Sequence, residues 1–488
     1  MNPFDLHPHH VSRRHFFRDC GVGLGKIALA GLLTDRWGQR LSASPLAGTP
    51  AAAAQSPHFP GRAKRVIHLF MGGAPSQLDL FDHKPELAKL EGRPLPPSVI
   101  GGQRYAFIRP DAAVLGPRFK FARHGQCGTE ISEVLPHLGK IVDDICLVRS
   151  VRTDQFNHAP AQIFFNTGFS QPGRPSLGSW VLYGLGSESQ NLPAFVVMST
   201  GGGLSGGAAL WSSGFLPTVH TGVRLRNQGP PILNVDNPAG IDTRLQRDTL
   251  DLVADLNQKR LGTVGDPEIA TRIASYEMAF RLQTSAPELM DLRGESPETL
   301  KMYGCDPAKP SFARACLLAR RMIERGSRFV TVNHFDTVFN ISCWDMHADG
   351  NSLNNTYADY ERMLCPQFDL AYTALIEDLD ARGLLQDTVV AVVSEMGRTP
   401  RLNARGGRDH HPACWTNFLA GGGIKGGQVY GASDKQGGQP ADNPVEPPQF
   451  IATIYKAMGI DLDTTMMPGP GDRPVRLIEA EPIRQLLS

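Results

Sequence analysis

The stretch that decides the fold reads Val66-Ile67-His68-Leu69-Phe70-Met71 and is followed at once by Gly72-Gly73 and Pro75. A nearly continuous apolar run of this length, ended by glycine and proline, is typical of a buried strand that leads into a loop. Helical patterns at 312–325 and 357–382 lie between further runs of the same kind. Buried strands that alternate with helices predict an α/β fold with a mostly parallel sheet covered by helices on both faces. The other expected strands are 145–151, 194–199, 328–333, 388–394 and 417–420.

The composition limits the size of the core and the kinds of partner. The chain has 488 residues, 41% of them hydrophobic, and a net charge of +1. A large core can therefore form, and no charge excess favours binding to nucleic acid. After the N-terminal segment no apolar run reaches the roughly 20 residues of a membrane helix, so we expect no stable membrane span in the mature chain. Eight cysteines without a Cys-x-x-Cys pair argue against a thiolate zinc site.

The first 60 residues have the order of a twin-arginine export signal followed by a tether. The run Ser12-Arg13-Arg14-His15-Phe16-Phe17-Arg18 precedes an apolar stretch from Cys20 to Leu33, and 41–60 is rich in Ala, Ser and Pro. An ordinary amphipathic N-terminal helix is the alternative. We expect a protein that folds in the cytoplasm, is carried by the twin-arginine export machinery, and is periplasmic or otherwise exported.

The remaining chain, 61–488, is expected to form one domain with an insertion. From 201 to about 310 the alternation of strands and helices is interrupted by a glycine-rich loop and two long helical stretches, 243–261 and 267–284. This segment is interpreted as an insertion or cap on the main domain.

Chemically active side chains follow the 388–394 strand of the predicted sheet. Glu395 comes directly after the 388–394 strand and lies three residues before Arg398. This pattern suits a metal-ligating carboxylate near an anion-binding guanidinium. A surface ion pair between the two residues is the alternative. Downstream, the glycine-rich segment Arg408-Asp409-His410-His411 offers imidazole and carboxylate ligands, although adjacent loop histidines are otherwise usually solvated.

Two earlier loops add further carboxylates. Asp345 and His347 form an Asp-x-His pair after the 328–333 strand, which is a compact metal-binding unit or, alternatively, a turn capped by Asp345. Asp79 and Asp82 follow the first strand; either completes a metal shell, while the other caps a helix that starts near Lys84. Because a parallel sheet gathers such loops along one edge, the sequence predicts a site for a divalent ion, whether zinc, manganese, calcium or magnesium.

Several motifs together resemble a known family. They are Gly-Gly-x-Pro-Ser-Gln-Leu-Asp-Leu-Phe-Asp from Gly72, Trp-Asp-x-His at Trp344, Glu-x-Gly-Arg-Thr-Pro at Glu395 and Gly-Arg-Asp-His-His-Pro at Gly407. With the signal and the 312–325 helix, they resemble the family called domain of unknown function 1501 over essentially the whole exported chain. That family is grouped with the alkaline phosphatase and sulfatase superfamily, so the resemblance implies an alkaline-phosphatase/sulfatase-like, metal-dependent core.

The segment from His158 to Gly168 differs from sulfatases at one decisive position. It follows the sulfatase layout Cys-x-Pro-Ser-Arg-x-x-x-x-Thr-Gly, but His158 replaces the cysteine that becomes formylglycine, and Gln162 replaces the arginine. Formylglycine chemistry is therefore excluded here. His158 is a covalent nucleophile, a general base or a metal ligand, or else a helix-entry histidine without a catalytic part.

The expected function is that of an exported metal-dependent hydrolase of phosphate or sulfate esters, acting on a small molecule or a polysaccharide. Besides His158, Arg398 or Arg408 would stabilise developing negative charge. The alternative is a non-catalytic binding or assembly protein of the cell envelope that keeps the fold, which His158 and Gln162 favour. The expected metal ligands are drawn from Asp79, Asp345, His347, Glu395, Asp409, His410 and His411.

Overall fold

The structure is a computed structural model that describes residues 55–97, 111–201, 203–227, 229–232, 237–334, 343–347, 356–403, 407–463, 465–469 and 473–488. The predicted export signal and most of the tether lie outside these residues. The chain divides into two units, Met1–Thr49 and Pro50–Ser488, and the description below concerns the second. None of the helices among the described residues is long and apolar enough to cross a membrane.

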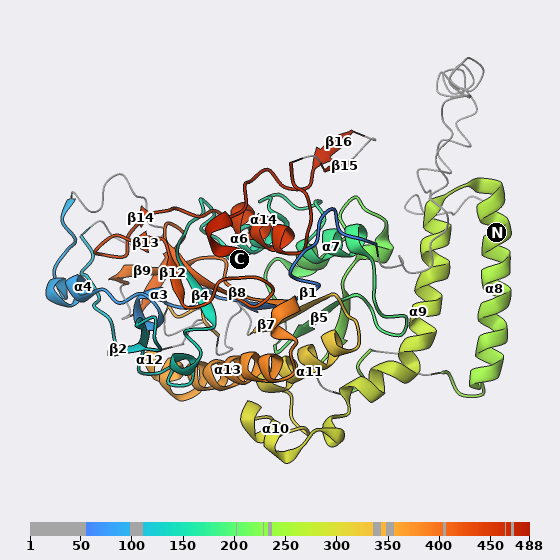
Figure 1. The fold of residues 1–488 in the computed structure, drawn as a ribbon, viewed down its shortest axis with the longest axis horizontal. Coiled ribbons are helices and arrows are strands. Elements are labelled where there is room, and N and C mark those ends of the chain that lie inside the picture. Colours follow the sequence, from blue (N-terminus) through green and yellow to red (C-terminus); the bar gives the residue numbers. More distant parts are fainter. Residues whose placement is uncertain are drawn as a thin grey trace, which may run out of the picture. The chain divides into compact units, whose positions relative to one another are not determined.

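A mixed eight-stranded sheet forms the centre of this unit (Figure 1). All its strands run in the same direction except β11, which lies antiparallel to both of its neighbours. The predicted α/β fold with a mostly parallel sheet is therefore confirmed. In spatial order the strands are β12 (Gln428–Tyr430), β4 (Ile145–Val151), β11 (Trp415–Ala420), β8 (Thr388–Val393), β1 (Arg65–Met71), β7 (Phe329–His334), β5 (Phe195–Ser199) and β6 (Val223–Arg226).

The two faces of the sheet carry separate hydrophobic cores, because successive side chains of a strand point to opposite faces. Ile67 and Leu69 pack into the core that includes α11 (Phe312–Glu324) and α13 (Cys365–Ala381). Val66 and Phe70 pack into the core that includes α6 (His158–Thr167), α7 (Leu177–Leu185) and α14 (Pro447–Ala457). Figure 1 shows the two helical layers on either side of the strands.

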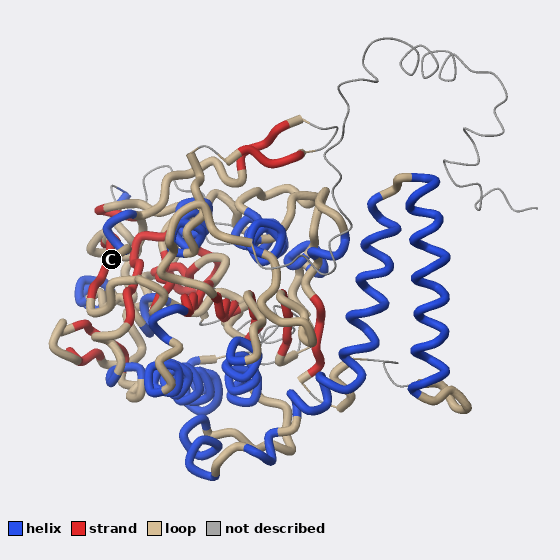
Figure 2. The backbone as a smooth tube through the Cα atoms, turned by 45° about the vertical axis from the view of Figure 1, so that its right-hand side comes forward, coloured by secondary structure: helices blue, strands red, loops and turns tan. Residues whose placement is uncertain are grey.

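The predicted strands agree with the structure to within two residues at each end, and two short strands of the central sheet were missed. These are β12 and β6; the latter lies inside the 201–310 segment, so that segment adds an edge strand to the sheet as well as helices. Its helices are α8 (Thr243–Val264), α9 (Pro267–Met290) and α10 (Pro297–Tyr303), and α8 and α9 pack together as a hairpin (Figure 2).

Short elements complete the described structure. The helix expected near Lys84 is α4 (Pro85–Leu90). The remaining helices are α3 (Gln77–Leu80), α12 (Tyr357–Asp359) and the π-helical turn Tyr360–Leu364 that leads into α13. Four two-stranded sheets pair β2 (Phe121–His124) with β3 (Thr129–Ser132), β9 (Gly397–Leu402) with β10 (Arg408–His411), β13 (Ala432–Ser433) with β14 (Pro440–Asp442), and β15 (Met466–Pro468) with β16 (Pro474–Arg476).

Candidate metal centre

Residues from four separate segments meet at the carboxyl edge of the sheet. His158 is the first residue of α6, which follows β4, and Asp345 follows β7. Glu395 comes directly after β8, and His410 lies in the β9–β10 hairpin that follows it. Because β1, β4, β7 and β8 run in one direction, their carboxyl ends share this edge, as expected for ligand sites of parallel sheets.

Asp345 lies at the centre of the cluster and faces three imidazoles. Its Oδ2 is 3.2 Å from His158 Nε2. Its Oδ1 is 2.9 Å from His347 Nε2 and 3.3 Å from His410 Nε2. One ligand atom each from His158, Asp345 and His410 lies within 4.8 Å of the others, which is close enough for all three to share one cation. The cluster therefore has the donor types and the spacing of a divalent metal site.

The other nitrogen of each ring is held by an oxygen. His158 Nδ1 is 2.8 Å from Glu395 Oε1, His347 Nδ1 is 2.8 Å from Asp409 Oδ1, and His410 Nδ1 is 2.8 Å from the Phe156 carbonyl oxygen. Oxygen acceptors at all three Nδ1 atoms favour a proton there, which directs the Nε2 lone pairs toward Asp345. This pairing of an outer acceptor with an inner ligand atom is usual for histidines that bind metals.

The inner nitrogens are poorly satisfied by protein groups alone. His158 Nε2 is buried and has no hydrogen bond among the described residues, since its approach to Asp345 lacks hydrogen-bond geometry. His347 Nε2 and His410 Nε2 lie 3.0 Å apart, a separation at which at most one proton can lie between two lone pairs. Nitrogen lone pairs left facing one carboxylate fit a cation, so the residues present fit the divalent ion predicted from the sequence.

Charge and burial shift the pKa values of His158 and His410 in opposite directions. Burial lowers the pKa of His158, but the Asp345 and Glu395 carboxylates outweigh it and raise that pKa to about 9. Burial, reinforced by the charge of His158, lowers the pKa of His410 to about 4. Burial opposes ionisation of Asp345, yet Arg398 and His158 hold its pKa well below the usual range. At neutral pH the metal-free cluster thus holds an ionised Asp345, a protonated His158 and a neutral His410.

The cluster opens to solvent on its imidazole side. The side chains of His158, His347 and His410 keep 12%, 12% and 11% of their surface exposed, whereas Asp345 keeps 3% and Glu395 none. Solvent therefore reaches the cluster along the edges of the histidine rings, whereas both carboxylates are buried.

Glu395 is fixed by residues of two other segments, the loop after β1 and helix α6. Its Oε1 accepts hydrogen bonds from Gly73 N and Gln162 Nε2, both at 3.0 Å. Gly73 has a φ of 106°, and a Cβ there would lie 2.6 Å from Asp345 N, so only glycine fits. The role of Gln162 was missed from sequence, although its spacing of four from His158 places both on one face of α6. Glu395 Oε2 has no hydrogen-bond partner among the described residues.

Arg398 holds Asp345 in place. Its side chain is fully buried, and Nη2 donates to Asp345 Oδ1 and to the Gly73 carbonyl oxygen. Nε donates to the Ala74 carbonyl oxygen at 2.8 Å, while Nη1 approaches the Arg408 carbonyl oxygen and His347 Nε2, each at 3.3 Å. All five N–H groups are directed at protein atoms, so Arg398 positions the carboxylate and leaves no donor for an anionic substrate.

Three predicted site residues make their contacts outside this cluster. Arg408 forms a buried, bidentate ion pair with Asp79, at 2.8 Å (Nε to Oδ2) and 3.2 Å (Nη2 to Oδ1). Its remaining N–H groups donate to the carbonyl oxygens of residues 115, 116 and 399. His411 is buried, with Nε2 2.9 Å from the Gly438 carbonyl oxygen. The structure thus gives Asp79, Arg408 and His411 structural contacts, whereas Asp409 supports His347 from behind.

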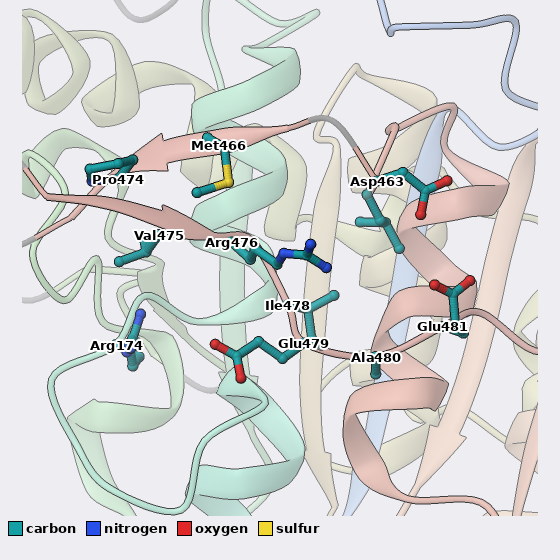
Figure 3. A pocket seen from close by; sticks show the side chains of 11 residues that line it. Arg174, Asp463, Met466, Pro474, Val475, Arg476, Ile478, Glu479, Ala480 and Glu481 are labelled. Atoms are coloured by element: carbon teal, nitrogen blue, oxygen red, sulfur yellow. The ribbon is translucent and has the colours of Figure 1, made fainter.

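A cavity of about 710 Å³ lies elsewhere, beside the β15–β16 hairpin (Figure 3). Its charged lining residues are Arg174, Asp463, Arg476, Glu479 and Glu481, of which all but Arg174 are exposed. None of its lining residues belongs to the metal cluster.

Comparison with known proteins gives a family. The family described as "Protein of unknown function (DUF1501)" matches residues 63–487. No curated protein matches the chain.

Several solved structures share a distant likeness. A phosphonate monoester hydrolase from Silicibacter pomeroyi is 12% identical, with a TM-score of 0.32 over 72% of this chain and 71% of that one. The PsFucS1 sulfatase from Pseudoalteromonas sp. is 11% identical, with a TM-score of 0.33 over 89% and 71%. A protein in the alkaline phosphatase superfamily from Vibrio parahaemolyticus is 10% identical, with a TM-score of 0.33 over 85% and 71%. TM-scores this low do not assign an activity.

Proposed function

The chain belongs to the DUF1501 family, whose description names no activity, and from its own residues we propose that it is a metal-dependent hydrolase of phosphate or sulfate esters that works without formylglycine. One observation carries the proposal: the Nε2 atoms of His158, His347 and His410 converge on the Asp345 carboxylate, while each Nδ1 is held by an oxygen. Such a cluster binds a divalent ion and presents it on the solvent side.

The residues divide the work as follows. His158, His410 and Asp345 hold the ion, with His347 beside them, and Arg398 keeps Asp345 in position. When bound, a divalent ion polarises an ester oxygen and lowers the pKa of a water molecule. The partly exposed imidazole edges admit the substrate, and Glu395 fixes the orientation of His158 through Nδ1. With histidine at position 158, phosphoryl or sulfuryl transfer through the aldehyde hydrate of formylglycine has no starting group.

Metal content and ester hydrolysis test the proposal together. Purified protein should hold one or more tightly bound divalent ions, measured by plasma mass spectrometry, and should hydrolyse an aryl phosphate, phosphodiester or sulfate ester. His158→Ala and His410→Ala should lose both properties. His137→Ala is the matched control, because His137 is not part of the cluster and its Nδ1 lies 3.2 Å from Lys140 Nζ. Metal-free wild-type protein, or ester hydrolysis that survives both site substitutions, would contradict the proposal.

A non-catalytic metal-binding protein of the cell envelope is the second candidate. The observation that favours it is the full engagement of Arg398 and Arg408, which leaves neither guanidinium free to meet an anionic ester. Bound metal without hydrolysis of any of the three ester classes would select this candidate over the hydrolase.

We propose export by the twin-arginine route from the run Ser12-Arg13-Arg14-His15-Phe16-Phe17. Replacing Arg13 and Arg14 together with lysine should retain the protein in the cytoplasm, measured by cell fractionation and immunoblotting. Unchanged distribution of the double variant would refute this route.

A further inference from the structure

Helix α8 carries an apolar stripe that no element among the described residues covers. Leu245, Leu252 and Leu256 are 50%, 60% and 58% exposed, and none of the residues of α8 is buried. At 3.6 residues per turn, these three leucines lie within about 40° of one another on the helix surface. Such a stripe is unusual on a helix of this length, because isolated exposed leucines are common but aligned ones mark contact surfaces.

The opposite side of α8 is already occupied by α9. Arg247 Nη1 donates to Glu277 Oε2 of α9 at 3.0 Å, and its guanidinium lies 4.8 Å from the centre of the Phe280 ring. Leu250 and Val253 are partly buried on this side. Figures 1 and 2 show α8 as the outer helix of the hairpin. The leucine stripe therefore points away from α9, and the rotation of α8 that exposes it is fixed by the Arg247 contacts.

Charges beside the stripe are arranged so that the helix complements itself. Asp248 flanks the stripe in the first half of α8, and Asp255, Lys259 and Arg260 lie in the second half. Asp248 and Lys259 lie on the same flank, about 20° apart around the helix. Neither has an ion-pair partner in the part of the chain that the structure describes.

We propose that α8 is a homodimer interface in which two copies pack antiparallel through the leucine stripe. A two-fold axis near residues 253 and 254 sets Asp248 of each copy beside Lys259 of the other, and Leu252 beside Leu256. The same surface then serves both copies, as in the closed two-fold interfaces that are commonest among homo-oligomers. In this antiparallel arrangement the same flank of each helix meets its counterpart, which is why Asp248 of one copy faces Lys259 of the other.

The interface is small, since each copy contributes one helix face. We therefore expect a dissociation constant in the micromolar range, measured on the full-length protein by analytical ultracentrifugation up to about 100 µM. Asp248→Lys and Lys259→Asp should each weaken the dimer roughly tenfold, because each turns two ion pairs into two repulsions. Gln258→Asp is the control: it changes charge at an exposed position of the same helix about 140° from the stripe, and should leave dimerisation unchanged.

Two recombinations of these variants test the geometry. The double variant Asp248→Lys/Lys259→Asp should regain wild-type dimerisation. A mixture of the two single variants should form heterodimers more tightly than either forms homodimers, because only the mixed pair restores both attractions. A protein that is monomeric at 100 µM would overturn the proposal. That is also the result expected if the N-terminal apolar segment, rather than a second copy, covers the stripe. Dimers that ignore both single substitutions, or no association in the mixture, would also overturn it.

Discussion

Metal binding at the cluster should release a proton from His158, and its affinity should rise with pH. His158 has a pKa of about 9 in the metal-free protein, so about 1% of molecules carry it neutral at pH 7. Because Nε2 must be unprotonated to bind an ion, the apparent affinity at pH 7 is about 100-fold below its limit above pH 9, or about 3 kcal/mol. The apparent association constant should rise about tenfold per pH unit over this range, on top of any contribution from His347.

Calorimetry measures this linkage directly. Zinc or manganese titrated into chelator-treated protein at pH 7, in two buffers of different ionisation enthalpy, should show close to one proton released per ion from His158. Competition with a chelator at pH 6.5, 7.5 and 8.5 should give the slope. In His158→Ala both the residual affinity and the slope should fall, whereas His137→Ala should match the wild type. An affinity that is independent of pH, with no proton released, would refute the assignment of His158 as a ligand.

Three further outcomes separate ligands from supporting residues. Arg398→Lys keeps the charge but loses the fork that holds Asp345, so metal affinity measured by calorimetry should fall about tenfold or more; an unchanged affinity would contradict the positioning role. Asp79→Asn leaves Arg408 buried without its counter-ion, and should destabilise the protein by about 3–5 kcal/mol in urea unfolding while the metal content stays the same; lost metal would instead make Asp79 a ligand. His68 is buried in β1 with no hydrogen-bond partner among the described residues, and burial lowers its pKa to about 3. Because only the neutral form of His68 fits the folded protein, the free energy of unfolding falls as the pH drops below 6.5, by about 2 kcal/mol at pH 5. His68→Leu removes this loss and should raise the melting temperature more at pH 5 than at pH 8. Equal shifts of the melting temperature at both pH values would count against this account.

The strands and the sheet edge could be predicted from sequence because the signal is local. An apolar run such as 66–71, ended by two glycines, defines a buried strand without reference to the rest of the chain. The direction of the parallel strands then places His158, Asp345 and Glu395 at one edge. The local pattern also predicted His347, since Asp345 and His347 stand two residues apart in one loop.

The division of roles within the site could not be read in the same way. Asp79 and Arg408 are 329 positions apart, and nothing near either residue shows that each neutralises the other. Likewise, the acceptor for His410 is a backbone carbonyl, that of Phe156, which leaves no trace in residue identity. Sequence supplies candidates for a metal site, whereas the choice between ligand and support depends on long-range pairing.

The reversed strand β11 has a consequence for the segment that precedes it. β8 delivers the chain to the carboxyl edge, and β11 carries it back alongside β8, with Ser394 N bonded to Asn417 Oδ1 at 3.0 Å and Trp415 Nε1 bonded to the Ser394 carbonyl oxygen at 3.1 Å. The segment 395–414 therefore leaves the sheet and returns to it at one point, where hydrogen bonds join Ser394 to β11. Glu395, Arg398 and His410 are thus all carried by one excursion of the chain whose two ends are tied to each other.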